Sequence, residues 1–425
     1  MYEYIIHIAD IHIRAGTETN SRYNEYVLVF ENLKQSLLSS NINNAIIVIA
    51  GDIFHNKNKV ENFGLDLFKK LINLLTDIAK TVIIPGNHDF LQQYPDDPSL
   101  LDSILLTNIK NLYYLNKTCT LTLDNICIST ISIKDTLIPG EGSGIINDLP
   151  LFPKDFIDFK EGISTKVALF HGSFCKTFFN HNQQVDGNNS YPLEMLKGFD
   201  IGCLGDIHLH QEGVYDTCSY AYSGSLIQQN FGEDIIDHGY LIWDIKTKKS
   251  KHIPIVNQYG FVVFKYNNGW TIKYRNNFIE IEDIIKKHNF PKNISIRIDG
   301  TYSNIDTLYN TLKTHNINVI DFKSIIGTVK PFQNIQTETN DTNYFKLYFK
   351  DTPIVSEYID NPNKLLIKSD SLKPIIDKRN DKILQSIENY KEAIELDNKT
   401  TNSHSTFTLN TLEFENCLCY GKNNK

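Results

Sequence analysis

The sequence predicts an α/β sandwich built on two mixed β-sheets. Over the first ninety residues, short apolar runs alternate with stretches of helical periodicity in the order strand, helix, strand, helix, strand. The runs Tyr4–Ala9, Ala45–Ala50 and Thr81–Pro85 are apolar along almost their whole length, as expected for strands covered on both faces. Each run leads directly into polar residues, and ligands gather at such strand ends.

The helices and the later strands complete this prediction. Helices are expected in the periodic stretch after Asn20 and over Val60–Lys80. From about residue 110, shorter strands predict a second sheet of mixed or antiparallel character; they are NLYYLN, CTLTL, ICISTISI, VALFHG, DIGCLGD, AYSGS, HGYLIWDI and KHIPIV. Pro139–Pro150 and Asn180–Asn189 are rich in Gly, Asn and Asp, which predicts either loops over the site or unstructured insertions.

Four segments are expected along the 425 residues, because a chain of this length exceeds one ordinary core. Residues 1–260 would form the α/β domain, and residues 261–334 a small α+β unit with three strands and two helices. Residues 335–400 combine a linker with an amphipathic helix over Pro374–Leu396, whose apolar stripe packs either on its own chain or on a partner. Residues 401–425 close the chain.

Composition is typical of a soluble, intracellular, globular protein. Apolar residues make up 41% and charged residues 22%, and neither a signal peptide nor a membrane-spanning run is expected. The seven cysteines form no CxxC pair, which favours reduced thiols. A net charge of -8 argues against a purely electrostatic nucleic-acid binder, so any DNA contact must use metal and local basic patches. The basic run Lys246–His252 favours a solvated hairpin turn over a phosphate contact.

Five polar segments follow strands and together predict a metal centre. In chain order they are Asp10-Ile-His12, Gly51-Asp52-Ile-Phe-His55, Gly86-Asn87-His88-Asp89, His171-Gly172 and Gly205-Asp206-Ile-His208-Leu-His210. Carboxylate, imidazole and amide groups suit manganese, iron, magnesium or zinc. Each segment alone is a weak signal, because a lone Asp-x-His occurs by chance and Gly-Asp is common in turns. Their order and their placement at strand ends make the set strong, and two ions are needed to use so many ligands.

These motifs resemble those of the calcineurin-like metallophosphoesterases over about residues 5 to 240. Within that superfamily, GDIFH and the segment Tyr222-Ser-Gly-Ser225, followed by Phe231 and Glu233, are similar to SbcD-type nucleases, whereas protein phosphatases carry Asp-Arg-Gly after Gly-Asp. The resemblance implies a four-layer sandwich, two mixed sheets flanked by helices, with a small α+β DNA-capping domain. It also implies a metal-dependent nuclease, with 3′–5′ exonuclease and endonuclease activity, in double-strand-break repair and recombination.

The resemblance further implies a role for each site residue. One ion would be held by Asp10, His12, Asp52 and His208, and the other by Asp52, Asn87, His171 and Asp206, with Asp52 as the bridge. The expected ions are manganese, with magnesium or iron as alternatives. His88 would stabilise the charged transition state or protonate the leaving oxygen, and His55 would assist it; imidazole suits this role because it titrates near neutrality. Asp89 either orients its loop or is an ordinary turn residue.

The last motif departs from the family pattern, Gly-His-x-His, because Asp206 replaces its first histidine. A carboxylate can still bind the second ion. In another register, His208 and His210 would form the ligand pair. A third alternative is that the second ion is lost and the domain survives as a scaffold, against which the presence of Asn87 and His171 argues.

Residues 407–421 weakly resemble the opening strand of the SbcC-type ATPases that partner such nucleases. No phosphate-binding G-x-x-x-x-G-K-[ST] loop occurs in the chain. The chain is therefore either a fragment of a nuclease fused to its ATPase, which we favour slightly, or it ends in an ordinary edge strand. The implied partners are DNA, an SbcC-like ATPase and a second copy of the chain, with no membrane. The competing functions are a phosphomonoesterase or protein phosphatase, since the fold does not choose the substrate, and a catalytically weak scaffold.

Overall fold

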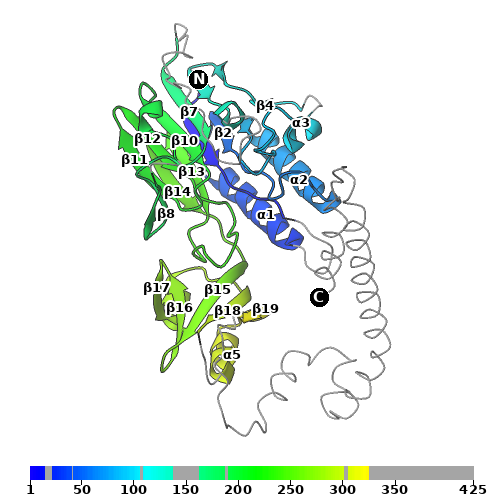
Figure 1. Ribbon diagram of the computed structural model, residues 1–425, viewed down its shortest axis with the longest axis vertical. Helices are drawn as coiled ribbons and strands as arrows, with labels where there is room; N and C mark the ends of the chain where they lie inside the picture. Colours follow the sequence, from blue (N-terminus) through cyan, green and yellow to red (C-terminus); the bar gives the residue numbers. More distant parts are fainter. Residues whose placement is uncertain are drawn as a thin grey trace, which may run out of the picture. The chain divides into compact units, whose positions relative to one another are not determined.

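Two six-stranded sheets carry most of the described strands (Figure 1). The protein is represented by a computed structural model that describes residues 1–14, 22–40, 42–105, 109–136, 162–186, 190–300 and 305–324. All of these residues belong to one compact unit, Met1–Thr328.

The first sheet has the strand order β14-β13-β1-β2-β3-β4. Its strands are β1 (Tyr4–Ile8), β2 (Ala45–Ala50), β3 (Lys80–Ile84), β4 (Leu112–Tyr114), β13 (Gly239–Asp244) and β14 (Lys249–Pro254). The strands β1 to β4 run parallel to one another; β13 pairs antiparallel with β1, and β14 pairs antiparallel with β13.

The second sheet has the strand order β11-β12-β10-β7-β6-β5. Its strands are β5 (Cys119–Leu123), β6 (Ile126–Thr130), β7 (Thr165–His171), β10 (Ile201–Gly205), β11 (Gln211–Tyr215) and β12 (Cys218–Tyr222). The four inner strands are parallel, and the edge strands β5 and β11 are antiparallel to their neighbours. Both sheets are mixed, as the sequence predicts.

Three strands expected in the second sheet belong to the first, so this part of the prediction is wrong. The segments NLYYLN and HGYLIWDI contain β4 and β13, and KHIPIV overlaps β14; β13 returns to pair with β1 through Ile5 and Trp243. Both sheets bury the same kinds of apolar residue, so an apolar run identifies a strand without identifying its neighbour. The basic run that follows β13 does form the expected hairpin between β13 and β14.

An apolar layer fills the space between the two sheets. Val48 and Val82 of the first sheet are fully buried there with Val167 and Leu169 of the second. Helices α1 (Tyr23–Ser39) and α2 (Asn62–Ile78) cover the other face of the first sheet. Their buried residues recur at the spacing of one helix face: Tyr26, Val29, Phe30, Leu33 and Leu37 in α1, and Leu67, Leu71 and Leu75 in α2. The layered α/β sandwich predicted from the sequence is confirmed.

The outer face of the second sheet has a different cover. Within the described ranges it is packed by the 3-10 turn η4 (Leu193–Leu196) and by the aromatic rings of Phe170, Phe174 and Tyr191, with no α-helix. The described part of the segment Asn180–Asn189, which was expected as a loop, contributes to a small hairpin of β8 (Phe178–Asn180) and β9 (Gln183–Gln184). Two further short elements are α3 (Leu100–Ile104) and η1 (Ile133–Thr136).

Residues 259–324 form a third sheet with its own apolar core, in the strand order β17-β16-β15-β18-β19 (Figure 1). Its elements are β15 (Tyr259–Tyr266), β16 (Trp270–Tyr274), β17 (Asn277–Glu280), α4 (Ile281–Lys287), β18 (Asn293–Asp299), α5 (Ile305–Thr314) and β19 (Asn318–Ser324). The three predicted strands and two predicted helices are all present. The strands β16 and β17 were not predicted, although the sequence WTIKY of β16 alternates apolar and polar residues; the two strands are short, and Asn-rich turns flank them.

Arg22 joins the start of α1 to this third sheet. Its guanidinium group donates to Glu25 at 2.6 and 2.9 Å and to the backbone oxygen of Gln228 at 2.7 Å, and it lies 5.2 Å from the ring centre of Phe261. The Gln228 amide in turn bonds both backbone groups of Phe261, at 2.9 and 2.7 Å. The side chains of Arg22 and Glu25 are only 15% and 6% exposed, so this is a largely desolvated ion pair.

Several predicted features lie outside the described residues. These are the linker and helix of residues 335–400, the tail of residues 401–425 and the loop Pro139–Pro150. Among the described helices, none combines the length and apolar character needed to cross a bilayer.

Candidate metal centre

The polar segments that follow the parallel strands meet where those strands end. Asp10, Asp52 and Asp206 follow β1, β2 and β10, and His171 is the last residue of β7. The backbone turns sharply there, and φ is 52° at Asp10, 47° at His12, 54° at Asp52 and 96° at Asp206. Such left-handed conformations cost about 1–3 kcal/mol each and persist where the surrounding structure holds them. Their concentration at ligand-type residues indicates a functional site.

Two glycines of the motifs allow the ligand loops to approach one another. A Cβ atom at Gly86 would lie 2.1 Å from the Asp52 carboxylate, and one at Gly205 would lie 2.0 Å from the backbone oxygen of Ala50. Any side chain at either position would therefore push adjacent loops apart. The glycines preceding Asn87 and Asp206 in the sequence are required by this close packing.

Asp52 lies between two imidazoles. Its Oδ2 is 3.3 Å from Nε2 of His12, and its Oδ1 is 3.3 Å from Nε2 of His171. Burial opposes ionisation of Asp52, but the charges of His171 and His12 outweigh it and hold the pKa of this carboxyl below its usual value. A carboxylate that offers one oxygen to each side has the arrangement of a bridging ligand.

In two histidines, a hydrogen bond at Nδ1 fixes which ring nitrogen carries the proton. Nδ1 of His171 donates to the backbone oxygen of Ala50 at 2.8 Å, and Nδ1 of His208 lies 2.8 Å from the Glu233 carboxylate. Nε2 of each ring is thereby directed toward the carboxylate cluster, and Nε2 of His208 lies 2.9 Å from Nε2 of His12. Metal-binding histidines are held by oxygen acceptors in this way.

Asn87 and Asp206 complete the cluster on the side of His171. The Asn87 amide nitrogen donates to Asp206 Oδ1 at 3.0 Å, and the same oxygen lies 3.7 Å from Nε2 of His171. The other oxygen of Asp206 accepts from the Ser173 hydroxyl, and its backbone N–H donates to both oxygens of Asp10 at 3.0 and 3.1 Å.

His210 is placed differently from Asp206. Its ring stacks on His252, with centroids 4.3 Å apart and an interplanar angle of 15°, and its Nε2 lies 3.5 Å from Glu212. Of the two registers considered from the sequence, the geometry therefore favours the one in which Asp206 and His208 face the cluster.

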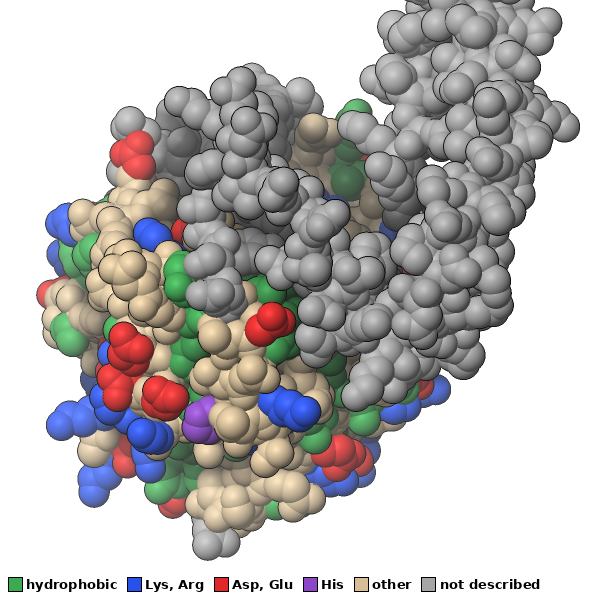
Figure 2. All heavy atoms as spheres, turned by 90° about the horizontal axis from the view of Figure 1, so that it is seen from below, with side chains coloured by type: hydrophobic (Ala, Val, Ile, Leu, Met, Phe, Trp, Pro, Cys, Tyr) green, Lys and Arg blue, Asp and Glu red, His purple; other side chains and the backbone are tan. Residues whose placement is uncertain are grey.

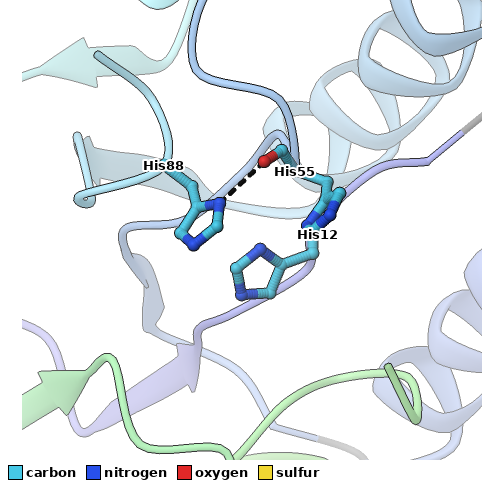
Figure 3. Close-up of side chains that lie close together, drawn as sticks. All are labelled: His12, His55 and His88. Atoms are coloured by element: carbon cyan, nitrogen blue, oxygen red, sulfur yellow. Dashed lines mark hydrogen bonds between the residues drawn. The ribbon is translucent and has the colours of Figure 1, made fainter. Parts of the chain in front are cut away.

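His12, His55 and His88 lie together (Figure 3). Nδ1 of His88 donates to the backbone oxygen of His55 at 2.7 Å, since a carbonyl can only accept, and the two rings stack with centroids 5.3 Å apart. The backbone N–H of His88 donates to Asp52 Oδ1 at 2.8 Å. Burial lowers the pKa of His55 to about 4, so its imidazole is neutral at neutral pH.

A model of the calcineurin-like phosphoesterase family matches residues 4–320. The chain belongs to this family. The phosphoesterase class accounts for the gathering of carboxylate, amide and imidazole groups at the strand ends, since hydrolysis of phosphoesters in this family uses divalent metal ions.

Curated relatives of this phosphoesterase extend well beyond the matched region. An uncharacterized protein of Acanthamoeba polyphaga mimivirus is 28% identical over 99% of this chain and 29% of its own length. The DNA double-strand break repair protein Mre11 of Methanopyrus kandleri is 23% identical over 65% of this chain and 56% of its own. The chain thus spans under a third of one relative and just over half of the other. Among solved structures, GAP50, the anchor in the inner membrane complex of Plasmodium, aligns with a TM-score of 0.33 at 10% identity, covering 76% of this chain and 98% of its own.

The site of this phosphoesterase fits divalent cations. Two buried atoms of ligand type, Oδ1 of Asn87 and Nε2 of His171, make no hydrogen bond within the described residues. Burial disfavours protonated imidazole, yet Asp52 and Asp10 outweigh it and raise the pKa of His171 to about 9. The bond to Glu233 and the charge of Asp10 likewise outweigh burial and raise the pKa of His208 to about 9. The cluster therefore attracts positive charge at each of these positions, which a cation would supply.

Two parts of the site were not found from the sequence. Glu233, noted there only as a family feature, holds His208, and Ser173 holds Asp206; neither role has a sequence signal beyond the motif itself.

Asp89, for which the sequence allowed either a loop-orienting role or an ordinary turn, accepts backbone N–H groups from Gly86, Ile53 and Phe54 at 2.8, 3.1 and 2.9 Å. It therefore ties the loop of Asn87 to the loop of Asp52.

Proposed function

We propose that this phosphoesterase is a metal-dependent DNA nuclease with exonuclease and endonuclease activity in double-strand-break repair. The phosphoester chemistry follows from the family, and the DNA substrate is supported by the Mre11 relative and by the segment from Tyr222 to Glu233. The observation that carries most weight is that Glu233 of this segment reaches the ligand cluster and holds His208.

Two cations, manganese first, would be held in two ligand sets that share Asp52. Asp10, His12 and His208 would complete one set, and Asn87, His171 and Asp206 the other. When bound, such a pair of ions activates water and neutralises charge on the phosphate. The proposed roles of the ligands rest on the convergence of their donor atoms.

His88 is proposed as the residue that handles the proton of the leaving oxygen. Its Nδ1–H is engaged by the His55 carbonyl, so the proton exchanged with a substrate must be carried on Nε2 (Figure 3). Its backbone N–H bond to Asp52 keeps the ring beside the proposed ions. In this arrangement the backbone of His55 positions His88, and the neutral imidazole of His55 packs against it.

Local contacts would hold the DNA. On the face seen in Figure 2, Lys and Arg side chains are interspersed with Asp and Glu among the described residues, and the whole chain carries a net charge of -8. Phosphate binding at the metal centre would supply affinity that the mixed surface does not. An SbcC-like ATPase and a second copy of the chain are proposed as partners, because the motifs resemble those of SbcD-type nucleases.

The test is manganese-dependent hydrolysis of end-labelled double- and single-stranded DNA, measured beside the phosphomonoester p-nitrophenyl phosphate. We expect DNA cleavage that His88→Ala slows about 10²- to 10⁴-fold. Turnover of the phosphomonoester with intact DNA would instead favour a phosphomonoesterase or protein phosphatase. Inactivity toward both substrates would favour a scaffold or a partner-dependent enzyme.

A further inference from the structure

A pocket of about 300 Å³ opens beside the metal centre. His208 belongs to its wall and also brings Nε2 to within 2.9 Å of Nε2 of His12, so pocket and cluster share one side chain. The hairpin β8–β9 contributes Phe179, and the turn between β16 and β17 contributes Arg275. The volume is at the lower end of the range for small-molecule sites.

The charged groups of this pocket are already paired with one another. Asp234 accepts from His181 at 2.8 Å and from the backbone N–H of Arg275 at 2.7 Å, and Asp237 lies 3.1 Å from the Arg275 guanidinium. Glu233 is engaged by His208. A phosphate here would meet three carboxylates and one guanidinium that is already paired. The pocket therefore suits an uncharged, polar group better than an anion.

Flat surfaces line the same pocket. The Phe179 ring comes from β8 and is 44% exposed, although Phe is usually buried. The stacked imidazoles of His210 and His252 form part of the wall. Phe178 is the neighbour of Phe179 and is 42% exposed, but it does not line the pocket, because successive side chains of a strand point to opposite faces.

We propose that this pocket binds the nucleoside next to the phosphate held at the metal centre, with Phe179 stacking on the base. The proposal rests on the proposed nuclease function and adds to it a subsite for the uncharged part of the substrate. Stacking on an aromatic ring accepts any base, which suits an enzyme that cuts DNA without strong sequence preference. The amide side chains of Asn180 and Asn276 line the same pocket and would contact the sugar and the edge of the base.

Calorimetry of the manganese-loaded protein tests the proposal with two probes, deoxyadenosine monophosphate and inorganic phosphate. We expect the nucleotide to bind at least about tenfold more tightly than phosphate, and Phe179→Ala to weaken the nucleotide about tenfold while leaving phosphate unchanged. Phe179→Trp should retain the affinity, and Phe178→Ala, the matched control, should behave as wild type. Equal affinity for the two probes, equal weakening of both by Phe179→Ala, or the same loss in Phe178→Ala would overturn the proposal.

Cleavage of labelled DNA separates this proposal from the nuclease proposal. If Phe179 contributes to nucleotide affinity but DNA stays intact, the nuclease proposal fails and the nucleoside pocket stands. If DNA is cleaved and Phe179→Ala matches Phe178→Ala in both cleavage and nucleotide affinity, the pocket proposal alone is overturned.

Discussion

The Nε2 atoms of His12 and His208 lie 2.9 Å apart. Because Nδ1–H of His208 donates to Glu233, it is Nε2 of that ring that faces His12. Two such nitrogens come this close only when a proton or a cation lies between them. Glu233 therefore acts on the metal centre through the orientation and basicity of His208, without belonging to the ligand set.

Glu233→Gln should weaken manganese binding about 10- to 100-fold, because the amide keeps the shape of the side chain but loses the charge that supports His208. Calorimetric titration of the variant and of wild type with manganese measures the change.

The matched control for this variant is Glu212→Gln. Glu212 lies 3.5 Å from His210, outside the ligand cluster, and its side chain is 48% exposed. Its substitution should leave manganese affinity unchanged. Equal weakening in the two variants would show that the effect is one of net charge and would contradict the role of Glu233.

Substitutions of His88 and Asp52 should distinguish an effect on catalysis from an effect on metal binding. His88→Ala should keep manganese affinity but lower kcat about 10²- to 10⁴-fold, the usual contribution of a positioned acid or base. Asp52→Ala should lose both metal binding and turnover, because its two oxygens face His12 and His171. Manganese titration and the hydrolysis rate of bis(p-nitrophenyl) phosphate provide the two readouts. Loss of metal from His88→Ala would place that imidazole among the ligands instead.

The sequence predicts the central strands well, for one physical reason. A parallel strand covered on both faces must be apolar throughout, so β2 matches its predicted bounds, Ala45–Ala50, at both ends. The change to polar residues at its end then marks Asp52 as a ligand candidate. The position of a residue in a strand, or just after one, can therefore be predicted from sequence where the strand itself determines its environment.

Features that depend on contacts between residues far apart in the sequence cannot be predicted in the same way. The antiparallel pairing of β13 with β1 joins opposite ends of the domain, and no local pattern distinguishes it from pairing within the second sheet. The acceptor that orients the His88 ring is a backbone oxygen, that of His55. Every residue has a backbone oxygen, so the sequence does not reveal this role. Glu233 and Ser173 likewise acquire their roles only when the chain returns to the site.

Arg22→Ala should reduce the free energy of unfolding by about 3–5 kcal/mol, because it leaves the buried carboxylate of Glu25 without its cationic partner and with the Asn257 amide, at 2.8 Å, as a remaining donor. Urea denaturation at neutral pH measures the change. Lys70→Ala removes a pair with Asp66 at 2.8 Å whose side chains are 46% and 44% exposed, and it should have little effect. Similar losses in the two variants would mean that the Arg22 pair is solvated in solution.

His7 should make the protein sensitive to acid. Its ring is fully buried and Nε2 donates to the backbone oxygen of Leu204 at 3.1 Å; burial lowers its pKa to about 3, from 6.5 in the unfolded chain. Between these two values the unfolded chain binds a proton that the folded protein does not, so stability is full above pH 6.5 and falls as the pH drops. At pH 5 the loss is about 2 kcal/mol.

Urea denaturation with a metal chelator, at pH 7 and pH 5, measures this loss in wild type and in His7→Gln. The glutamine does not titrate, so the decrease in unfolding free energy between the two pH values should be about 2 kcal/mol smaller in the variant, while the contributions of the other titrating groups cancel in the comparison. An undiminished acid sensitivity in His7→Gln would mean that His7 is charged in the folded protein at pH 5. A charged His7 ring would need two acceptors, the Leu204 carbonyl for Nε2–H and a second one for Nδ1–H. Nδ1 makes no hydrogen bond within the described residues.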